Sequence, residues 1–292
     1  MAEATMQGKV CLVTGSSTGI GKATARELAR MGATVVLVCR SQSRGEAAQA
    51  EIKQSTGNDQ VDLIVADLSL LLDVRRVAET FRQRYSQLHV LINNAGAANH
   101  TRQITSDGLE STFALNYLAP FLLTELLLDV LKASAPARII NVSSMNHRNN
   151  TIHFDDLQGG KKYNMWRAYG QSKLALILFT YELADQLKGT GVTVNALHPG
   201  IIASEFGRGL GGFLHGAWKV IAPFISTVEQ GAQTTLYLAT SPAVEGVSGK
   251  YFINSKEAQS SRRSHDKQMR LRLWQVTQDL LEAVKTPQLP QD

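Results

Sequence analysis

The sequence predicts an α/β fold in which one doubly wound parallel sheet carries helices on both faces. Two observations lead to this prediction: short, almost wholly apolar runs typical of buried strands, and longer helical runs between them. Strands that alternate with helices form right-handed βαβ units, and such units assemble into one parallel sheet. No repeat or low-complexity stretch interrupts the alternation, so we expect a single domain.

The expected elements follow one another along the chain. The strands are expected at Val10–Thr14, Thr34–Cys39, Asp62–Val65, Val90–Asn93, Arg138–Val142, Thr193–Leu197 and Tyr251–Ile253. The helices are expected at Gly21–Met31, Gly45–Thr56, Leu70–Tyr85, Gly108–Leu131 and Tyr169–Leu187. We expect residues 1–260 to form the domain and residues 261–292 to add a C-terminal helix and tail to it.

The composition is that of a folded globular protein. Of the 292 residues, 43% are apolar and 19% are charged, which suits a core of ordinary size. A net charge of +5 raises the question of a nucleic-acid or anionic-lipid partner. The basic residues are scattered, apart from a cluster at 262–272, and lack interleaved aromatic residues. We therefore expect no nucleic-acid partner.

Cysteine usage and hydropathy bear on the compartment. Cys11 and Cys39 are the only cysteines, and both lie in apolar runs, as expected of thiols in a reducing compartment. The first ten residues lack the apolar segment of a secretory signal. No apolar run approaches the ~20 residues that span a bilayer. We expect a soluble, cytoplasmic protein without a transmembrane segment, and leave a peripheral membrane contact open.

The segment TGSSTGIG at 14–21 joins the first expected strand to the first expected helix. Glycine lets the backbone approach a ligand, and a helix start offers free N–H groups and a positive dipole to a pyrophosphate. The spacing Gly15-x-x-x-Gly19-Ile20-Gly21 differs from the commoner G-x-G-x-x-G. Its place between strand and helix predicts dinucleotide binding; a glycine-rich turn without a ligand is the alternative.

Arg40 bears on the choice of dinucleotide, because it follows the second strand. An acidic residue in this region binds the ribose 2′-hydroxyl of NAD, whereas an arginine can receive the 2′-phosphate of NADP. The acid is missing and Arg40 is present, which favours NADP (NADPH) over NAD. The alternative is a solvated arginine at a strand end.

Two further strand ends suit a bound dinucleotide. Asp67-Leu68 follows the third strand, where an adenine ring would lie. Asn93-Asn94-Ala95-Gly96 follows the fourth, and asparagine before glycine suits a turn at which backbone meets ligand. Either segment alone is equally typical of an ordinary turn.

Tyr169 is the only tyrosine followed four residues later by a lysine, Lys173. This spacing places both side chains on one helix face, where the ammonium eases ionisation of the phenol and allows proton exchange. Ser144 ends the fifth strand, 25 residues upstream of Tyr169, at the sheet edge where ligands bind. Asn116 is expected to hold a water or a helix kink near the lysine; a buried hydrogen-bonded amide is the alternative. The set predicts hydride and proton transfer between a nicotinamide cofactor and a carbonyl.

Taken in order, these motifs resemble the short-chain dehydrogenase/reductase family along nearly the whole chain. The matching segments are TGSSTGIG (14–21), DL (67–68), NNAG (93–96), Asn116, Ser144, YGQSK (169–173) and HPG (198–200). The resemblance implies a Rossmann-type NADP-binding domain. It also implies a catalytic set of Asn116, Ser144, Tyr169 and Lys173.

Finer segments are similar to the retinol dehydrogenase-like branch of that family. They are VLVCRS (36–41), SSMNHR (143–148), FDDLQ (154–158) and GTGVTVNALHPG (189–200). The resemblance implies an NADP-dependent reductase or dehydrogenase of retinoids or other lipophilic aldehydes. We expect this chain to lack the N-terminal membrane anchor of the animal members.

The motifs predict contacts with the cofactor, and one later segment predicts contacts with the substrate. The cofactor is expected to contact Gly15, Ser17, Thr18, Gly19, Ile20, Gly21, Arg40, Asp67, Leu68, Asn94, Ala95, Gly96, Tyr169, Lys173, Pro199, Gly200, Ile202 and Ser204. Residues 201–226 are rich in glycine and bulky apolar residues, which favours a flap over an apolar pocket or, equally, a packing insertion. The expected pocket walls are Phe206, Leu210, Phe213, Leu214, Trp218 and Phe224. We assign no metal ligands.

We expect a small lipophilic carbonyl or alcohol as substrate, a retinoid, a steroid or another ketone. The resemblance implies a homodimer or homotetramer, built partly on the helices around 108–131 and 169–187. Residues 261–285 predict a basic amphipathic helix that docks or contacts a subunit, with a membrane-surface helix as the alternative. The alternative function is a non-catalytic NADP-sensing protein that regulates a partner.

Overall fold

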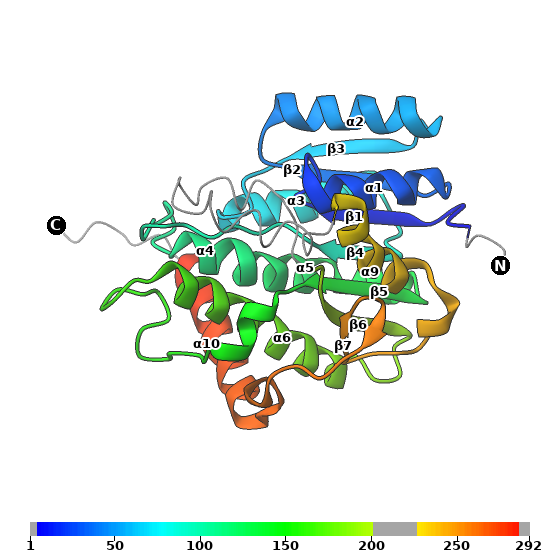
Figure 1. The fold of residues 1–292 in the computed structure, drawn as a ribbon. Helices are drawn as coiled ribbons and strands as arrows, with labels where there is room; N and C mark the ends of the chain where they lie inside the picture. The colour runs from blue at the N-terminus through cyan, green and yellow to red at the C-terminus, as the bar shows by residue number, and fades with distance from the viewer. Residues whose placement is uncertain (1–4, 201–226, 286–292) are drawn as a thin grey trace, which may run out of the picture.

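The computed structural model describes residues 5–200 and 227–285. Its sheet has the strand order β3-β2-β1-β4-β5-β6-β7-β8, and all neighbours pair in parallel except β7 and β8. The strands are β1 (Val10–Thr14), β2 (Thr34–Cys39), β3 (Val61–Val65), β4 (Val90–Asn93), β5 (Ala137–Val142), β6 (Val192–His198), β7 (Tyr251–Ile253) and β8 (Lys256–Glu257). The strand order reverses between β1 and β4, so the predicted doubly wound α/β fold is confirmed (Figure 1).

Helices cover both faces of the sheet. The α-helices are α1 (Gly19–Arg30), α2 (Gln42–Thr56), α3 (Leu71–Arg84), α4 (Ser111–Phe113), α5 (Ala119–Ala133), α6 (Met165–Gln186), α9 (Val228–Thr240) and α10 (Lys267–Lys285). The π-helical segment is η1 (Ala114–Leu118), and the 3₁₀ segments are η2 (Met145–Asn149), η5 (Pro242–Val244) and η6 (Arg262–His265). The helices α1, α2 and α9 lie on one face, and α3, α5 and α6 on the other.

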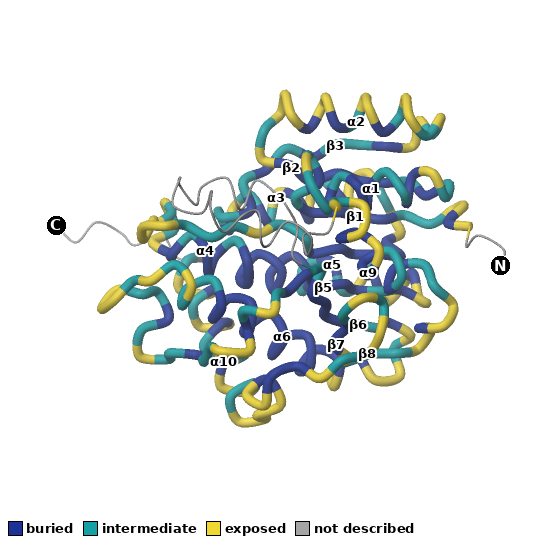
Figure 2. The backbone as a smooth tube through the Cα atoms, viewed as in Figure 1, coloured by how far each residue is buried: buried dark blue, intermediate teal, exposed yellow. Residues whose placement is uncertain are grey.

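The two larger parts of the core lie one on each face of the sheet. Successive side chains of a strand point to opposite faces, so Leu12 of β1 belongs to the part under α3, α5 and α6. Its neighbours Cys11 and Val13 belong to the part under α1 and α9. Both faces of the central strands are therefore buried (Figure 2), which explains their continuous apolar sequences. Cys11 and Cys39 are buried free thiols, as expected.

Three features of the chain differ from the sequence-based expectation. No helix was expected at Val228–Thr240, although a capping box of Thr227 and Gln230 starts α9. The helix expected at 261–285 is divided into η6 and α10, because Asp266 is extended and accepts a hydrogen bond from Met269 N as the cap of α10. The sheet also ends in the short antiparallel strand β8.

The C-terminal helix α10 packs along α6 (Figure 1). Trp274 lies against Phe121 of α5 and Phe179 of α6, with ring centroids 4.8 and 5.8 Å away. The hydroxyls of Thr277 and Tyr117 are 2.7 Å apart and buried. The chain's own C-terminal helix thus covers part of the α5–α6 surface on which subunit contacts were expected.

One helical stretch in the described part of the chain, Ser111–Ala133, is long and apolar enough to cross a membrane. Of its apolar 18-residue window, 67% is buried inside the fold. Core helices of globular proteins have this combination of apolar sequence and burial, so the stretch is weak evidence for a membrane span.

Candidate active site

A cavity of about 560 Å³ lies at the carboxyl ends of β1, β2, β3 and β4. Twelve of the predicted cofactor residues line it: Gly15, Ser17, Thr18, Gly19, Ile20, Gly21, Arg40, Asp67, Leu68, Asn94, Ala95 and Gly96. Val38, Cys39, Ala66, Ala97, Leu115 and Val228 complete its wall. The four strand ends singled out in the sequence therefore form one crevice.

Two glycines of the turn, Gly15 and Gly21, leave no room for a side chain. A Cβ at Gly15, whose φ is +67°, would lie 2.8 Å from Ala95 Cα. A Cβ at Gly21 would lie 2.3 Å from the carbonyl oxygen of Gly15. The N-cap of α1, Thr18, makes no side-chain capping bond. The first N–H groups and the dipole of α1 therefore suit the pyrophosphate of a dinucleotide.

Thr14 joins two of these strand ends, although the sequence analysis did not assign it a role. Its Oγ1 accepts hydrogen bonds from the backbone N–H groups of Asn94 and Ala95, both at 3.0 Å. The Asn94 side chain donates in return to the Thr14 carbonyl at 2.8 Å. The sequence does contain a signal for this role, because Thr14 begins the TGSSTGIG segment and places a hydroxyl at the end of a buried strand.

The two charged residues of the crevice differ in exposure and bonding. Arg40 is exposed at the end of β2 and lines the cavity. The carboxylate of Asp67 is half-buried and accepts hydrogen bonds from Ser69 N at 3.0 Å and from Ser69 Oγ at 2.7 Å. Arg40 is thus placed to meet an anionic group of a ligand, while Asp67 stabilises the turn after β3.

The proposed catalytic residues come from three neighbouring elements. Ser144 follows β5 and caps η2, Tyr169 and Lys173 lie one turn apart on α6, and Asn116 lies in η1. Lys173 is buried, and its Nζ donates to the Val142 carbonyl at 2.9 Å. The same Nζ lies 5.7 Å from the centroid of the Tyr169 ring. Ser144 and Tyr169 share a side-chain hydrogen bond that influences the pKa of the phenol.

Asn116 connects α6 to the loop after β4. Its Oδ1 accepts from Ala97 N, and its Nδ2 donates to Ala97 O, both at 2.9 Å. Nδ2 also donates to Ser172 Oγ at 3.0 Å. A Cβ on Gly96 would lie 3.2 Å from both Asn116 Oδ1 and Lys173 Nζ. The amide and the ammonium therefore meet at the same glycine, and the π-helical segment is the irregularity expected at Asn116.

Burial controls the ionisation of both central groups. Burial lowers the pKa of Lys173 to about 8. Burial raises the pKa of Tyr169, and its hydrogen bond with Ser144 lowers it by less. The expected lowering of the phenol pKa is therefore not found in this structure, because desolvation of the phenolate outweighs that bond.

Several predicted residues lie outside the crevice or outside the described part of the chain. Pro199 and Gly200 follow β6, and Gly200 has φ of +93°. The expected flap at 201–226 is not among the described residues. Ile202, Ser204, Phe206, Leu210, Phe213, Leu214, Trp218 and Phe224 all belong to it.

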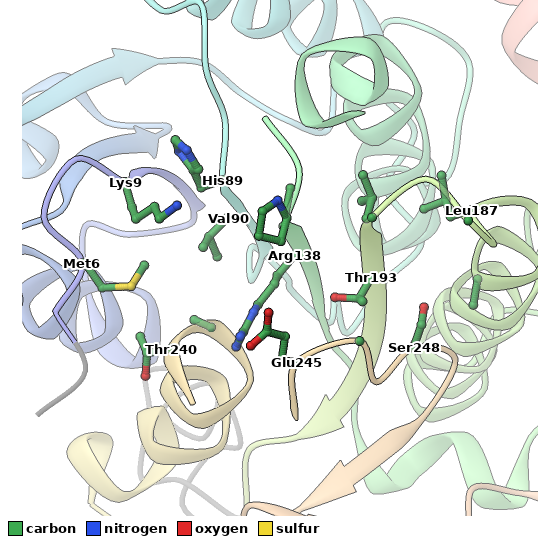
Figure 3. A pocket seen from close by; sticks show the side chains of 18 of the residues that line it. Met6, Lys9, His89, Val90, Arg138, Leu187, Thr193, Thr240, Glu245 and Ser248 are labelled. Carbon is green, nitrogen blue, oxygen red and sulfur yellow. The ribbon is translucent and has the colours of Figure 1, made fainter. Parts of the chain in front are cut away.

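A larger cavity, of about 650 Å³, lies at the opposite edge of the sheet, where β1, β4, β5 and β6 begin. Figure 3 shows Arg138 and Glu245 facing each other in it. The Arg138 guanidinium also donates to the carbonyls of Leu238 and Ser241. Among the described residues, no predicted site residue lines this cavity, so cavity size alone does not locate the candidate active site.

Known proteins resemble this chain in both sequence and fold. The family model for short chain dehydrogenase matches residues 9–211. Retinol dehydrogenase 12 of Mus musculus is 48% identical over 274 residues, which is 94% of this chain and 86% of that protein. Retinol dehydrogenase 11 of Homo sapiens is 47% identical over 276 residues, with coverages of 94% and 86%.

Two solved structures extend the comparison. An uncharacterised protein of Mycobacterium paratuberculosis has a TM-score of 0.78 at 32% identity, with 96% of each chain covered. The active-site complex of RhlG with NADP from Pseudomonas aeruginosa has a TM-score of 0.71 at 27% identity, covering 85% of this chain and 95% of that one. With the motifs gathered at one sheet edge, these likenesses show that the chain belongs to the short chain dehydrogenase family of oxidoreductases, in its retinol dehydrogenase-like branch.

Proposed function

We propose that this protein is an NADP-dependent oxidoreductase that interconverts a lipophilic aldehyde or ketone and its alcohol. The observation that carries the proposal is the convergence of Ser144, Tyr169 and Lys173 at the sheet edge that also forms the dinucleotide crevice. This convergence supports the proposal, because it would bring a hydroxyl, a phenol and an ammonium beside a bound nicotinamide cofactor.

The crevice fits NADPH by its shape and by its charge. The α1 N-terminus and the bare turn at Gly15 and Gly21 would hold the pyrophosphate, and Arg40 would receive the 2′-phosphate. Asp67 and Leu68 would border the adenine. When bound, NADPH supplies the hydride that reduces the carbonyl carbon. The NADP complex of the structural neighbour RhlG supports this choice by analogy.

The chain's own residues handle the proton. In reduction, the Tyr169 hydroxyl donates a proton to the developing alkoxide, and in oxidation the phenolate takes it back. Ser144 hydrogen-bonds the substrate oxygen and favours the charge that forms there. Lys173, with a pKa of about 8, is mostly a cation at neutral pH and stabilises the phenolate, and it would also hold the ribose hydroxyls. Asn116 completes a proton relay through water.

Apolar residues beside the catalytic set favour a lipophilic substrate. Met145 follows Ser144 and is 40% exposed, and Trp166 precedes Tyr169 on α6 and is 49% exposed. Contiguous exposed apolar surface marks binding sites, and these two side chains lie within three residues of Ser144 and Tyr169 in the sequence. The printed names of the relatives point to retinoids among such substrates, and steroid or other ketones stay within the proposal.

The proposal extends to location and assembly. The buried free thiols of Cys11 and Cys39 favour the cytoplasm, and a peripheral membrane contact is compatible with it. A homodimer or homotetramer is retained, but α10 covers part of the α5–α6 surface. We therefore place the subunit contacts on other parts of these helices or elsewhere.

Turnover with a substrate panel tests the function. Purified protein is mixed with NADPH and all-trans-retinal, nonanal, a steroid ketone or a hydrophilic sugar, and loss of NADPH absorbance is followed. We expect turnover with at least one of the three lipophilic carbonyls. Activity confined to the sugar would overturn the substrate class. Tight NADPH binding without any turnover would favour the NADP-sensing alternative instead.

Arg40→Asp tests the choice of cofactor. Removing the cation and placing a carboxylate beside the 2′-phosphate should shift the ratio of kcat/KM for NADPH to that for NADH at least tenfold toward NADH. The conservative Arg40→Lys should shift it less. A wild-type protein that already prefers NADH would contradict the role given to Arg40.

A further inference from the structure

His147 is a buried side chain next to the proposed catalytic residues that the mechanism above does not use. It lies in η2, three residues after Ser144, and has no exposed surface. Its ring packs edge-on against the ring of Tyr251, with 5.1 Å between centroids. An imidazole buried in this way needs hydrogen-bond partners for both ring nitrogens.

Both nitrogens have backbone partners from different parts of the chain. The Nε2 atom accepts a hydrogen bond from Ser261 N at 3.0 Å, and Nδ1 lies 2.6 Å from the carbonyl oxygen of Ser144. A backbone N–H can only donate, so Nε2 carries no proton. The proton is therefore on Nδ1, which donates it to the Ser144 carbonyl. The two contacts define one neutral tautomer of His147.

The surroundings favour that neutral state. Burial lowers the pKa of His147, the bond to Ser144 raises it, and the nearby Arg148 lowers it again. His147 in turn lowers the pKa of His198 at the end of β6, because like charges repel. The ring against which His147 packs, Tyr251, is a buried phenol whose pKa is raised by burial. The imidazole consequently stays neutral at physiological pH, and both backbone contacts persist.

The contact with Ser261 is part of a larger docking of residues 259–263 on η2. Arg148 Nη2 donates to the Gln259 carbonyl at 2.5 Å. Arg263 Nη1 donates to the Asn150 carbonyl at 2.9 Å. With the His147 contact, three hydrogen bonds join this segment to the loop that begins at Ser144.

On its other side, η2 is pressed against α6 beside Tyr169. A Cβ at Gly170 would lie 1.9 Å from Asn150 Nδ2, so only glycine allows this approach. The loop after Ser144 is thus held between the helix that carries the phenol and the 259–263 segment. Its position determines where the serine hydroxyl meets the phenol.

We propose that His147 is a positioning residue that couples the 259–263 segment to the backbone of Ser144. The inference rests on the proposed function, in which Ser144 binds the substrate oxygen. By holding the Ser144 carbonyl, the imidazole orients the serine peptide and hence its hydroxyl beside Tyr169. The segment lies beyond residue 211, where the match to the family model ends, so a part of the chain outside that match helps to shape the site.

A matched pair at Ser261 tests the coupling without touching the site itself. Ser261 has φ of −69°, which proline can adopt. Ser261→Pro removes the N–H that His147 accepts, whereas Ser261→Ala keeps it. With the best carbonyl of the panel, we expect Ser261→Pro to lower kcat about fivefold at unchanged KM for NADPH. Ser261→Ala should behave as the wild type.

Two substitutions of His147 separate its two contacts. Asparagine places an amide near the Nδ1 position and can still donate to Ser144, but it does not reach Ser261. Glutamine reaches toward Ser261 and loses the donor to Ser144. We expect His147→Gln to lower kcat about tenfold, and His147→Asn to resemble Ser261→Pro. Because His147→Asn and Ser261→Pro break the same contact, their effects should not add in the double variant.

His89→Leu is the control for a loss of stability alone. His89 is also buried and accepts a backbone N–H, from Val10 at 3.1 Å, but it lies at the opposite sheet edge. We expect it to lower Tm and to leave kcat unchanged. Equal kcat for Ser261→Pro and Ser261→Ala, or additive effects in the double variant, would overturn the coupling. If Ser261→Pro does not fold, equal kcat for His147→Gln and His147→Asn would overturn it.

The same assay separates this inference from the proposed function. Tyr169→Phe is measured beside the other variants. If Tyr169→Phe retains wild-type turnover, the catalytic assignment fails. If it abolishes turnover while both His147 variants behave as wild type, only the positioning role of His147 fails.

Discussion

The dinucleotide crevice and the C-terminal region are held together by different kinds of contact. The crevice is shaped by backbone at the glycine turn, where Gly15 and Gly21 leave no space for a Cβ. The C-terminal region is shaped by side chains, with Trp274 between aromatic rings of α5 and α6. The glycines of the crevice belong to one short motif, whereas the aromatic rings of the C-terminal region come from three separate helices. A substitution in the crevice should therefore raise the Kd for NADPH, whereas one in the C-terminal region should lower stability alone.

Gly21→Ala should have the largest effect on the crevice. The added Cβ would lie 2.3 Å from the Gly15 carbonyl oxygen and 2.4 Å from Asn94 Nδ2, so the turn has to move. We expect the Kd for NADPH to rise at least tenfold, and the free energy of unfolding to fall by about 3 kcal/mol. Titration of NADPH fluorescence and urea denaturation measure the two effects. Gly160→Ala is the control, because its Cβ would meet only side-chain atoms at 3.8 Å.

Trp274→Ala should lower stability without weakening NADPH binding. It removes the ring that packs on Phe121 and Phe179, so the free energy of unfolding should fall by about 3 kcal/mol. The crevice lies elsewhere, so the Kd for NADPH of the folded fraction should stay within twofold. Leu271→Ala on the same helix, at a side chain 48% exposed, should change stability little. A tenfold rise of Kd in Trp274→Ala would show that the two regions are not separable.

Acidification should lower stability through His198, a buried side chain at the end of β6 that belongs to neither region. Burial, followed by His147 and Arg148, lowers its pKa to about 4. The unfolded chain binds its proton at higher pH, so stability is present above pH 6.5 and is lost as the pH falls toward 4. From pH 7 to pH 5 this histidine should cost about 2 kcal/mol. Urea denaturation should show a smaller loss over that range in His198→Asn, and an identical loss would contradict the assignment.

The sequence was most informative where local chemistry leaves few options. Buried strands such as Val10–Thr14 and Thr34–Cys39 were predicted at their observed bounds, because both faces are covered and the runs are almost wholly apolar. The glycine-turn residues and Arg40 were predicted to share a site because parallel strands end at one edge. The lining of a single crevice by these residues follows from that topology.

The sequence was least informative where distant segments meet. The α9 helix was not predicted, although its capping box of Thr227 and Gln230 is present in the sequence. The Gly and Thr residues within it have low helix propensity, so the segment was taken for a loop. The pKa of Tyr169 was expected to fall, but burial raises it. The sequence does not show this, because the depth of burial of the phenol is a property of the fold and not of the motif. The contact between Ser261 and His147 joins residues 114 positions apart, and no spacing rule predicts it.

The central claim is that the Tyr169 phenol moves the proton during carbonyl reduction. The most direct measurement is kcat of Tyr169→Phe under saturating NADPH, with NADPH binding measured separately by fluorescence. We predict that kcat falls at least about a hundredfold, while the Kd for NADPH changes less than threefold. Turnover at the wild-type rate with intact NADPH binding would contradict the account.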